Sequence, residues 1–233
     1  MSDQKLNFTH DELKSSLKDA LAKSIEVKDN GRFYGYPGSN SLRSARFVWE
    51  VSKQLRRRYE SLLDVVSFVQ EVKDDGTKIG GEWLLDIAIA NTLPLVPTKS
   101  KALVNTGLIW AVESEYSTRR GEFAKDFGKL LCVRAENRLY LNGFNQLLGN
   151  EDRFIKDRVQ ETLAFLSRVC SLEVKGQPNG FQTGNLFLGF WPSPERGPKG
   201  TSSLWDVKKK SELITGVRLF RFNIGCMGFD EIN

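Results

Sequence analysis

The sequence predicts a mixed α/β fold, with a central mixed sheet of about four to six strands flanked by helices. Three observations support this class. Two amphipathic segments occupy the N-terminal part, a block of β-rich runs occupies the middle, and a long amphipathic segment follows in the C-terminal half. The change of hydrophobic period between these blocks distinguishes helices from strands.

The N-terminal part is expected to contain two helices. Residues 10–24 place Leu13, Leu17 and Leu21 at helical spacing, and Thr9 or Asp11 is suited to cap the start. A second helix is expected from about residue 42 to residue 63. Its inner side would carry Phe47, Val48, Val51, Leu55, Tyr59 and Leu62.

The middle block is expected to form the sheet. Residues 67–72, 82–90 and 106–116 are rich in β-branched and aromatic residues and are separated by turn or proline-containing segments. Residues 119–131 return to helical spacing, and residues 138–144 form a further short strand. The expected order is therefore a helix, three strands in a meander, a helix and a strand.

The C-terminal part is expected to contain a helix over 152–172 and strands over 185–191 and 216–224. No internal repeat and no clear linker divides the chain, so residues 1–233 are expected to form one domain. Within it we distinguish three parts: a helical N-terminal part (1–65), a core (about 60–145) and C-terminal helix and strands (150–233).

Composition narrows the chemistry. The chain has one histidine among 233 residues, which excludes a histidine-rich metal site and leaves His10 as the only histidine for a catalytic triad. Three cysteines without a CxxC pair are expected to be reduced thiols of a cytoplasmic protein. No secretory signal and no membrane span are expected. The net charge of +5 is compatible with a nucleic-acid partner.

Three carboxylates occur in the β-rich block, where apolar residues are expected. Asp86 interrupts the run LLDIAIA, and Glu113 and Glu115 lie two residues apart in IWAVESEY. On a strand such residues point to the same face. Burying like charges together is costly because each disfavours ionisation of the other. A divalent cation removes this cost, and Mg²⁺ or Mn²⁺ suits carboxylate ligands. The alternative is a solvated strand face, with the carboxylates paired to Arg119 or Arg120.

A strand Asp, followed by Glu-x-Glu on the next strand and then by a helix, resembles the PD-(D/E)XK, or restriction-endonuclease-like, nuclease superfamily. Asp86 matches the first acidic position and Glu113 the second. Glu115 stands where the superfamily usually has lysine, and Leu85 where it usually has proline. The resemblance covers roughly residues 60–145 and implies a restriction-endonuclease-like core.

The resemblance implies a Mg²⁺-dependent (or Mn²⁺-dependent) endonuclease of restriction, repair or mobile-element type that hydrolyses DNA phosphodiesters. Asp86 and Glu113 would then hold the metal, and Glu115 would orient or deprotonate the attacking water. The missing lysine would be supplied by the following helix, where Lys129 lies closer to the apolar face than Lys125 does.

DNA is the expected partner, and a homodimer is a possible assembly because restriction-type enzymes commonly dimerise. The basic residues expected to contact nucleic acid are Arg43, Arg46, Arg119, Arg120, Lys208, Lys209 and Lys210. The run Arg56–Arg58 is interpreted as a solvated helix face. Two alternatives stay open: a catalytically inactive nuclease-fold protein that binds nucleic acid or protein, which Glu115 favours, and a protein–protein module with an acidic partner.

Overall fold

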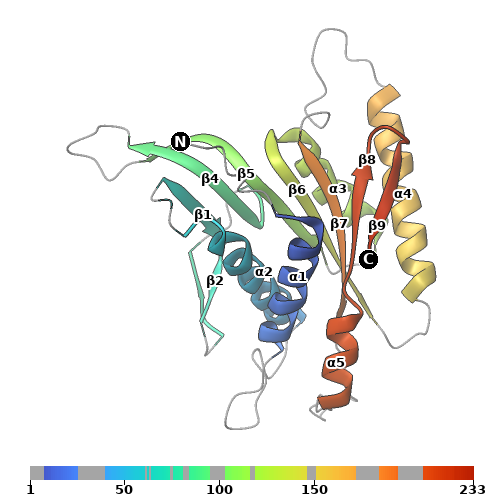
Figure 1. The fold of residues 1–233 in the computed structure, drawn as a ribbon, viewed down its shortest axis with the longest axis horizontal. Coiled ribbons are helices and arrows are strands. Elements are labelled where there is room, and N and C mark those ends of the chain that lie inside the picture. The colour runs from blue at the N-terminus through green and yellow to red at the C-terminus, as the bar shows by residue number, and fades with distance from the viewer. Residues whose placement is uncertain are drawn as a thin grey trace.

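A seven-stranded mixed sheet with helices on both faces forms the body of the protein in a computed structural model (Figure 1). The structure describes residues 8–25, 40–60, 62, 64–73, 76–80, 84–94, 103–115, 119–145, 151–171, 184–193 and 207–233. The mixed α/β class expected from the sequence is confirmed. The sheet is larger than the four to six strands expected.

The helices are α1 (His10–Ser24), α2 (Asn40–Arg57), α3 (Arg120–Cys132), α4 (Glu151–Ser171) and α5 (Val207–Thr215). The strands are β1 (Val65–Val69), β2 (Glu71–Val72), β3 (Lys78–Ile79), β4 (Ile87–Pro94), β5 (Leu103–Glu115), β6 (Ala135–Asn145), β7 (Asn185–Ser193), β8 (Arg218–Asn223) and β9 (Gly228–Ile232). Strands β2 and β3 form a separate two-stranded sheet.

The large sheet has the order β1-β4-β5-β6-β7-β8-β9. Pairing is antiparallel from β1 through β5, parallel from β5 through β7, and antiparallel again to β9. The two parallel steps need crossover connections, and α3 and α4 lie in them. Strands β1, β4 and β5 form the expected antiparallel meander.

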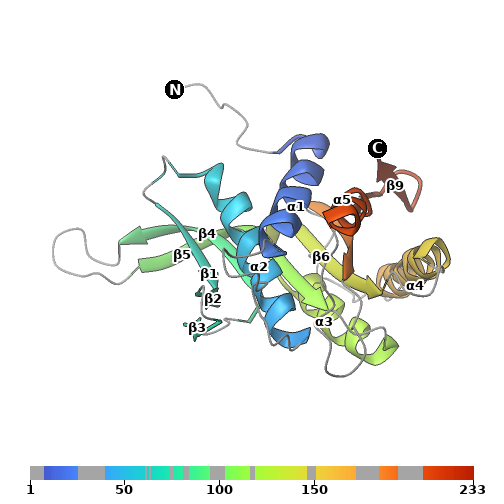
Figure 2. The ribbon, with the colours of Figure 1, turned by 90° about the horizontal axis from the view of Figure 1, so that it is seen from below.

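Two hydrophobic cores lie on opposite faces of the sheet, and Figure 2 shows α1 and α3 on opposite sides of the strands. Because successive strand residues alternate in direction, Val112 contributes to the core that includes α1 and α2, and Ala111 to the core that includes α3 and α4. The side chains that follow Ala111 at every second position, Glu113 and Glu115, therefore lie on the α3 face.

Helix α1 begins and ends where the sequence predicts. Thr9 and Glu12 form a capping box, with the Thr9 hydroxyl accepting from the Glu12 amide at 3.2 Å. Leu13, Leu17 and Leu21 are buried. His10 is half-buried, with its ring edge-on to Phe187, rather than fully exposed as a polar segment suggests.

Several predicted boundaries were wrong. Helix α2 ends at Arg57 and does not reach residue 63. Strand β4 begins only after Asp86 and continues to Pro94, through residues expected to lie in a loop. Helix α5, strand β9 and the β2–β3 hairpin were not predicted. None of the helices in the described part of the chain is long and apolar enough to cross a membrane.

Candidate metal centre

Asp86 and Glu113 face each other at the start of the β4–β5 hairpin. Ile87 pairs with Val112, so Asp86, one residue before the strand, lies opposite Glu113. The Ser114 amide donates a hydrogen bond of 2.7 Å to Asp86 Oδ2. This bond holds the Asp86 carboxylate against strand β5. The sequence suggested that Asp86 lies within a strand, but β4 begins one residue later, at Ile87.

Glu113 is a buried carboxylate, with 1% of its surface exposed. Burial, followed by the charge of Asp86, raises the pKa of Glu113 from 4.5 to about 8, although Lys129 opposes the shift. Glu113 therefore keeps its proton to a higher pH than an exposed glutamate does. Burial makes the larger contribution to this shift, and the like charge comes from Asp86 rather than from Glu115 on the same strand.

Lys129 of α3 contacts Glu113 from the helix side. Its Nζ donates to both carboxylate oxygens, at 3.3 and 3.1 Å, and lies 2.9 Å from Asp126 Oδ1. Burial lowers the pKa of Lys129, but the hydrogen bonds and charges of Asp126 and Glu113 outweigh it and raise the pKa overall. Lys129 therefore remains a cation beside Glu113. Of the two lysines considered from the sequence, Lys129 contacts Glu113, whereas Lys125 is exposed.

Glu115, Glu122 and Asp126 form a second acidic group. One carboxylate oxygen from each lies within 4.8 Å of the other two. Glu115 comes from β5, and the other two come from α3. Sequence reasoning missed Glu122 and Asp126. Their signal was the spacing of residues 122, 126 and 129, which share one helix face directly after the acidic strand.

Two buried polar side chains of β6 lie beside these carboxylates. Tyr140 pairs in register with Glu113, and Asn142 with Glu115. Tyr140 is fully buried, and its hydroxyl has no hydrogen-bond partner among the described residues. Burial raises the pKa of this hydroxyl, and the charge of Arg158 opposes the shift. Asn142 donates to the Glu115 carbonyl at 2.9 Å, and its Oδ1 has no partner within the described part of the chain. Such atoms are rare in native proteins and fit a place for an ion, a water or a ligand.

Helix α4 adds a buried cation to the same face. The Arg158 guanidinium lies 4.5 Å from the centre of the Phe123 ring and is ion-paired with Glu161 at 3.0 Å. Glu161 also pairs with Arg120 at 2.5 Å. Burial lowers the pKa of Arg158. Arg120 thus bonds to Glu161 of α4. The solvated-face interpretation had paired it with the strand carboxylates instead.

The other basic residues expected to contact nucleic acid fall into three groups. Arg119 is exposed, and Arg120 is 85% exposed. Arg46 is buried and bonds to the Val72 carbonyl at 2.7 Å and to Glu50 at 3.2 Å, so it holds α2 against β2 and is not presented to a nucleic acid. The side chains of Arg43 and of Lys208, Lys209 and Lys210 lie outside the described residues.

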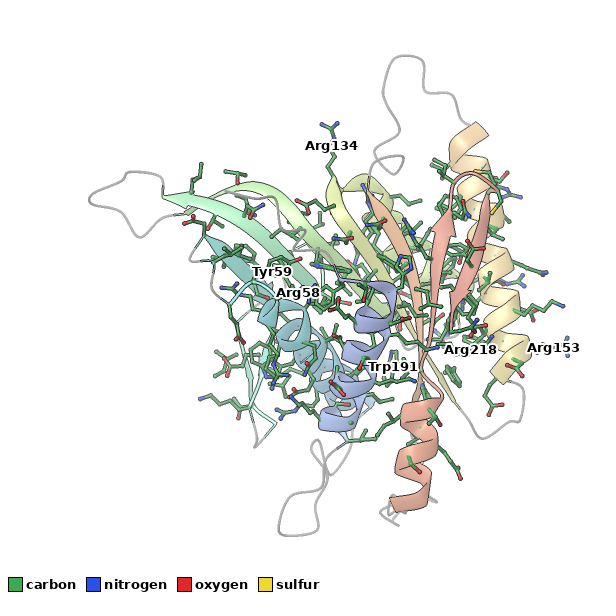
Figure 3. The ribbon with its side chains drawn as sticks, viewed as in Figure 1. Arg58, Tyr59, Arg134, Arg153, Trp191 and Arg218 are labelled. Carbon is green, nitrogen blue, oxygen red and sulfur yellow. The ribbon has the colours of Figure 1, made fainter. Side chains whose placement is uncertain are left out.

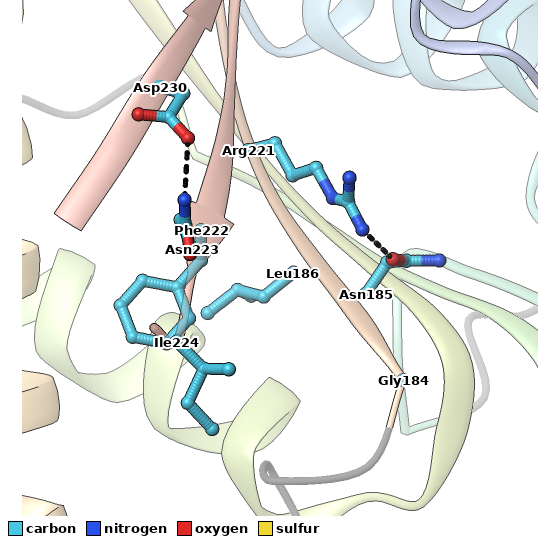
Figure 4. A pocket seen from close by; sticks show the side chains of 8 residues that line it. All are labelled: Gly184, Asn185, Leu186, Arg221, Phe222, Asn223, Ile224 and Asp230. Atoms are coloured by element: carbon cyan, nitrogen blue, oxygen red, sulfur yellow. Dashed lines mark hydrogen bonds between the residues drawn. The ribbon is translucent and has the colours of Figure 1, made fainter. Parts of the chain in front are cut away.

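Two cavities lie away from these carboxylates. One, of about 250 Å³, lies between the start of β7 and the end of β8 (Figure 4). Its polar groups pair with one another: Arg221 donates to Asn185 at 3.2 Å, and Asn223 donates to Asp230 at 3.0 Å. The other lies along α2.

A scan against protein-family models found no match, and neither the curated proteins nor the solved structures gave a significant match.

Proposed function

We propose that this chain is a Mg²⁺- or Mn²⁺-dependent nuclease that hydrolyses DNA phosphodiesters. The observation that carries the proposal is Glu113, a buried carboxylate opposite Asp86 and in contact with Lys129. A solvated strand face would leave this side chain exposed. A divalent cation would instead compensate the burial of two neighbouring carboxylates.

The order of the surrounding elements supports the proposal. The resemblance to the PD-(D/E)XK superfamily implies an acidic residue on one hairpin strand and a (D/E)-x-K pair on its neighbour, where this chain has Glu113 and Glu115, followed by a helix and a strand. Here β4 and β5 form the hairpin, and α3 and β6 follow. The restriction-endonuclease-like core and a cytoplasmic location belong to this proposal, and Cys132 and Cys226 are free thiols, which fits that location.

The residues present fit a hard cation. Asp86 and Glu113 would supply the carboxylate oxygens, as expected from the sequence, and the group of Glu115, Glu122 and Asp126 offers a second position. Mg²⁺ and Mn²⁺ favour such oxygen ligands and keep several waters. The unpartnered Tyr140 hydroxyl on the same face is a candidate donor to a bound water or a phosphate oxygen.

In the proposed reaction, a water oxygen forms a bond to phosphorus while the bond from phosphorus to the leaving sugar oxygen breaks. A divalent cation, which Asp86 and Glu113 would hold, would supply the polarisation of the phosphate and a water molecule of lowered pKa. Glu115 accepts the proton of the attacking water, and solvent water protonates the leaving oxygen. The Lys129 ammonium stabilises the negative charge that develops on the phosphate.

A specific observation favours the alternative of an inactive, nucleic-acid-binding relative. Glu115 replaces the usual lysine of the motif, and Lys129 is already paired with Asp126 and Glu113. If the lysine serves only to neutralise these carboxylates, the protein binds nucleic acid without cleaving it.

The test is cleavage of a supercoiled plasmid with Mg²⁺, Mn²⁺ or EDTA, using wild type, Asp86→Asn and Glu113→Gln. Both variants should lose at least about a hundredfold in rate. Glu136→Gln, which alters an exposed carboxylate of β6, is the matched control and should cleave normally. Unchanged cleavage by both site variants would exclude this site, and binding without cleavage by wild type would favour the inactive alternative.

Separate variants distinguish the two acidic groups. Glu122→Gln is an exposed substitution within the second group. If the metal needed for cleavage is held by Asp86 and Glu113 alone, this variant should raise the Mg²⁺ concentration for half-maximal rate only slightly. A loss as large as that of Glu113→Gln would move the essential metal to the second group.

A further inference from the structure

A groove of about 550 Å³ lies between α2 and the strands β1 and β3, and we call it the α2 groove. More cationic side chains than carboxylates line this groove. The cations are Lys23, Lys53, Arg56 and Arg57, and the carboxylates are Glu60 and Glu71. An excess of positive charge in a concave surface attracts polyanions.

Buried groups of α2 hold the cations of this groove in place. Lys53 Nζ lies 2.6 Å from Glu50 Oε1, and Glu50 is 1% exposed. Glu50 is held in turn by Arg46, which bonds to β2. Arg57 donates to Gln54 Oε1 at 3.0 Å, and Gln54 is also buried. Fixed cations lose less conformational freedom when a ligand binds.

One unpartnered polar atom lies in the groove. Ser67 lines it, and Ser67 Oγ is buried with no hydrogen-bond partner among the described residues. Leaving a buried polar atom unpaired is unfavourable, so a ligand that supplies an oxygen acceptor to Ser67 would recover part of this cost.

The groove also contains an aromatic surface. Trp49 lines it and is half-buried, and Lys53 Nζ lies 5.6 Å from the centre of the indole ring. A cation beside a half-buried indole is suited to a strand whose phosphate contacts the cation while a base stacks on the accessible part of the ring.

We propose that the α2 groove binds single-stranded nucleic acid, with Lys53 and Arg57 on phosphates and Trp49 beneath a base. The choice of nucleic acid as the ligand rests on the proposed function, whereas the groove itself is separate from the carboxylates. Binding here would place a strand on the α2 side of the sheet, opposite the α3 face that carries the carboxylates, and would not use the metal ligands.

The test is fluorescence anisotropy with a labelled oligothymidylate of about 16 nucleotides, in EDTA so that no cleavage occurs. The variants are Arg57→Gln, an exposed position, the double variant Lys53→Gln/Arg57→Gln, and Trp49→Leu. The matched control is Arg153→Gln on α4. Arg153 extends away from the body of the protein, in Figure 3, and lies 3.9 Å from Asp157.

The double variant should bind about tenfold more weakly, and the slope of log K against log salt should fall by about 1.4, since each lost single-strand phosphate contact removes about 0.7. Trp49→Leu should weaken binding several-fold at an unchanged slope. Arg153→Gln and Glu136→Gln should bind as wild type does, and because the assay contains EDTA its outcome does not depend on cleavage, which separates this inference from the nuclease proposal. Wild-type affinity in Arg57→Gln and in the double variant would overturn the inference, as would an absence of binding by the wild type.

Discussion

Lys129 of α3 donates to both carboxylate oxygens of Glu113 of β5, at 3.3 and 3.1 Å. The contact joins a helix residue to a strand residue across the α3 face, and Asp126 holds the same ammonium group at 2.9 Å. Lys129 therefore places one positive charge among the carboxylates that include Asp86 and Glu113.

Replacing this lysine tests its role in the reaction. Lys129→Met should lower the cleavage rate by about a hundredfold or more, since a charge that stabilises the reacting phosphate is removed. Lys129→Arg should recover part of the rate. The measurement is single-turnover cleavage at saturating Mg²⁺. Lys125→Met, an exposed position on the same helix, should have no effect, and an equal loss there would point to damage of α3 as a whole.

The stability of the metal-free protein should depend on pH through Glu113. Its folded-state pKa, about 8, lies above 4.5, so between these values the folded protein holds a proton that the unfolded chain has lost. The free energy of unfolding should therefore fall as the pH rises from 4.5 to about 8, by up to about 1.4 kcal/mol per pH unit. Urea denaturation in EDTA measures this slope.

Glu113→Gln is the control for the pH experiment, because glutamine fills the same space and does not titrate. The variant should lose most of the slope in this window and should be more stable than wild type above pH 8. A variant that kept the wild-type slope would show that another group causes it.

Asp86 should serve both the fold and the metal, and two substitutions separate these roles. Asp86→Asn keeps an oxygen to accept the Ser114 amide, so its free energy of unfolding should stay near that of wild type. Asp86→Ala leaves the amide without that partner and should lose about 1 kcal/mol. Both should abolish the rise in melting temperature on adding Mn²⁺. A normal Mn²⁺ response in Asp86→Asn would remove Asp86 from the ligands.

Gly184 should tolerate no side chain, because it precedes β7 with φ +90° and a Cβ there would lie 2.5 Å from the carbonyl oxygens of Ala135 and Glu136. Gly184→Ala should destabilise the protein by about 2 kcal/mol or more. Gly128 of α3 has open space around it, so Gly128→Ala should stabilise by about 0.5–1 kcal/mol. Urea denaturation of both variants checks this contrast, and equal effects would contradict it.

Helices and strands that depend mainly on their own residues could be predicted from local sequence patterns. The leucines of α1 and the cap at Thr9 fixed both ends of that helix. The end of β4 could not be predicted in this way, because Leu93 belongs to a strand through its pairing with Val104. Strand β9 was missed for the same reason: its sequence GFDEI is short and polar, and it is a strand through pairing with β8.

The residues of the candidate site also divide into those that local sequence patterns predict and those that depend on the fold. The strand period alone placed Glu113 and Glu115 on one face, and helical geometry favoured Lys129 over Lys125. Glu122 and Asp126 could be assigned to the site only once it was known which face of α3 turns toward β5. Arg46 was misassigned because a charged helix residue resembles a solvated one in sequence, while in the fold the carbonyl of Val72 and Glu50 satisfy it.

The most direct test of the central claim is a crystal structure with Mn²⁺, examined by anomalous diffraction. We predict a peak between the carboxylates of Asp86 and Glu113, within coordination distance of an oxygen of each. That peak should be absent from Glu113→Gln crystals treated in the same way. A map with no peak at Asp86 and Glu113, at a Mn²⁺ concentration that supports cleavage, would contradict the account.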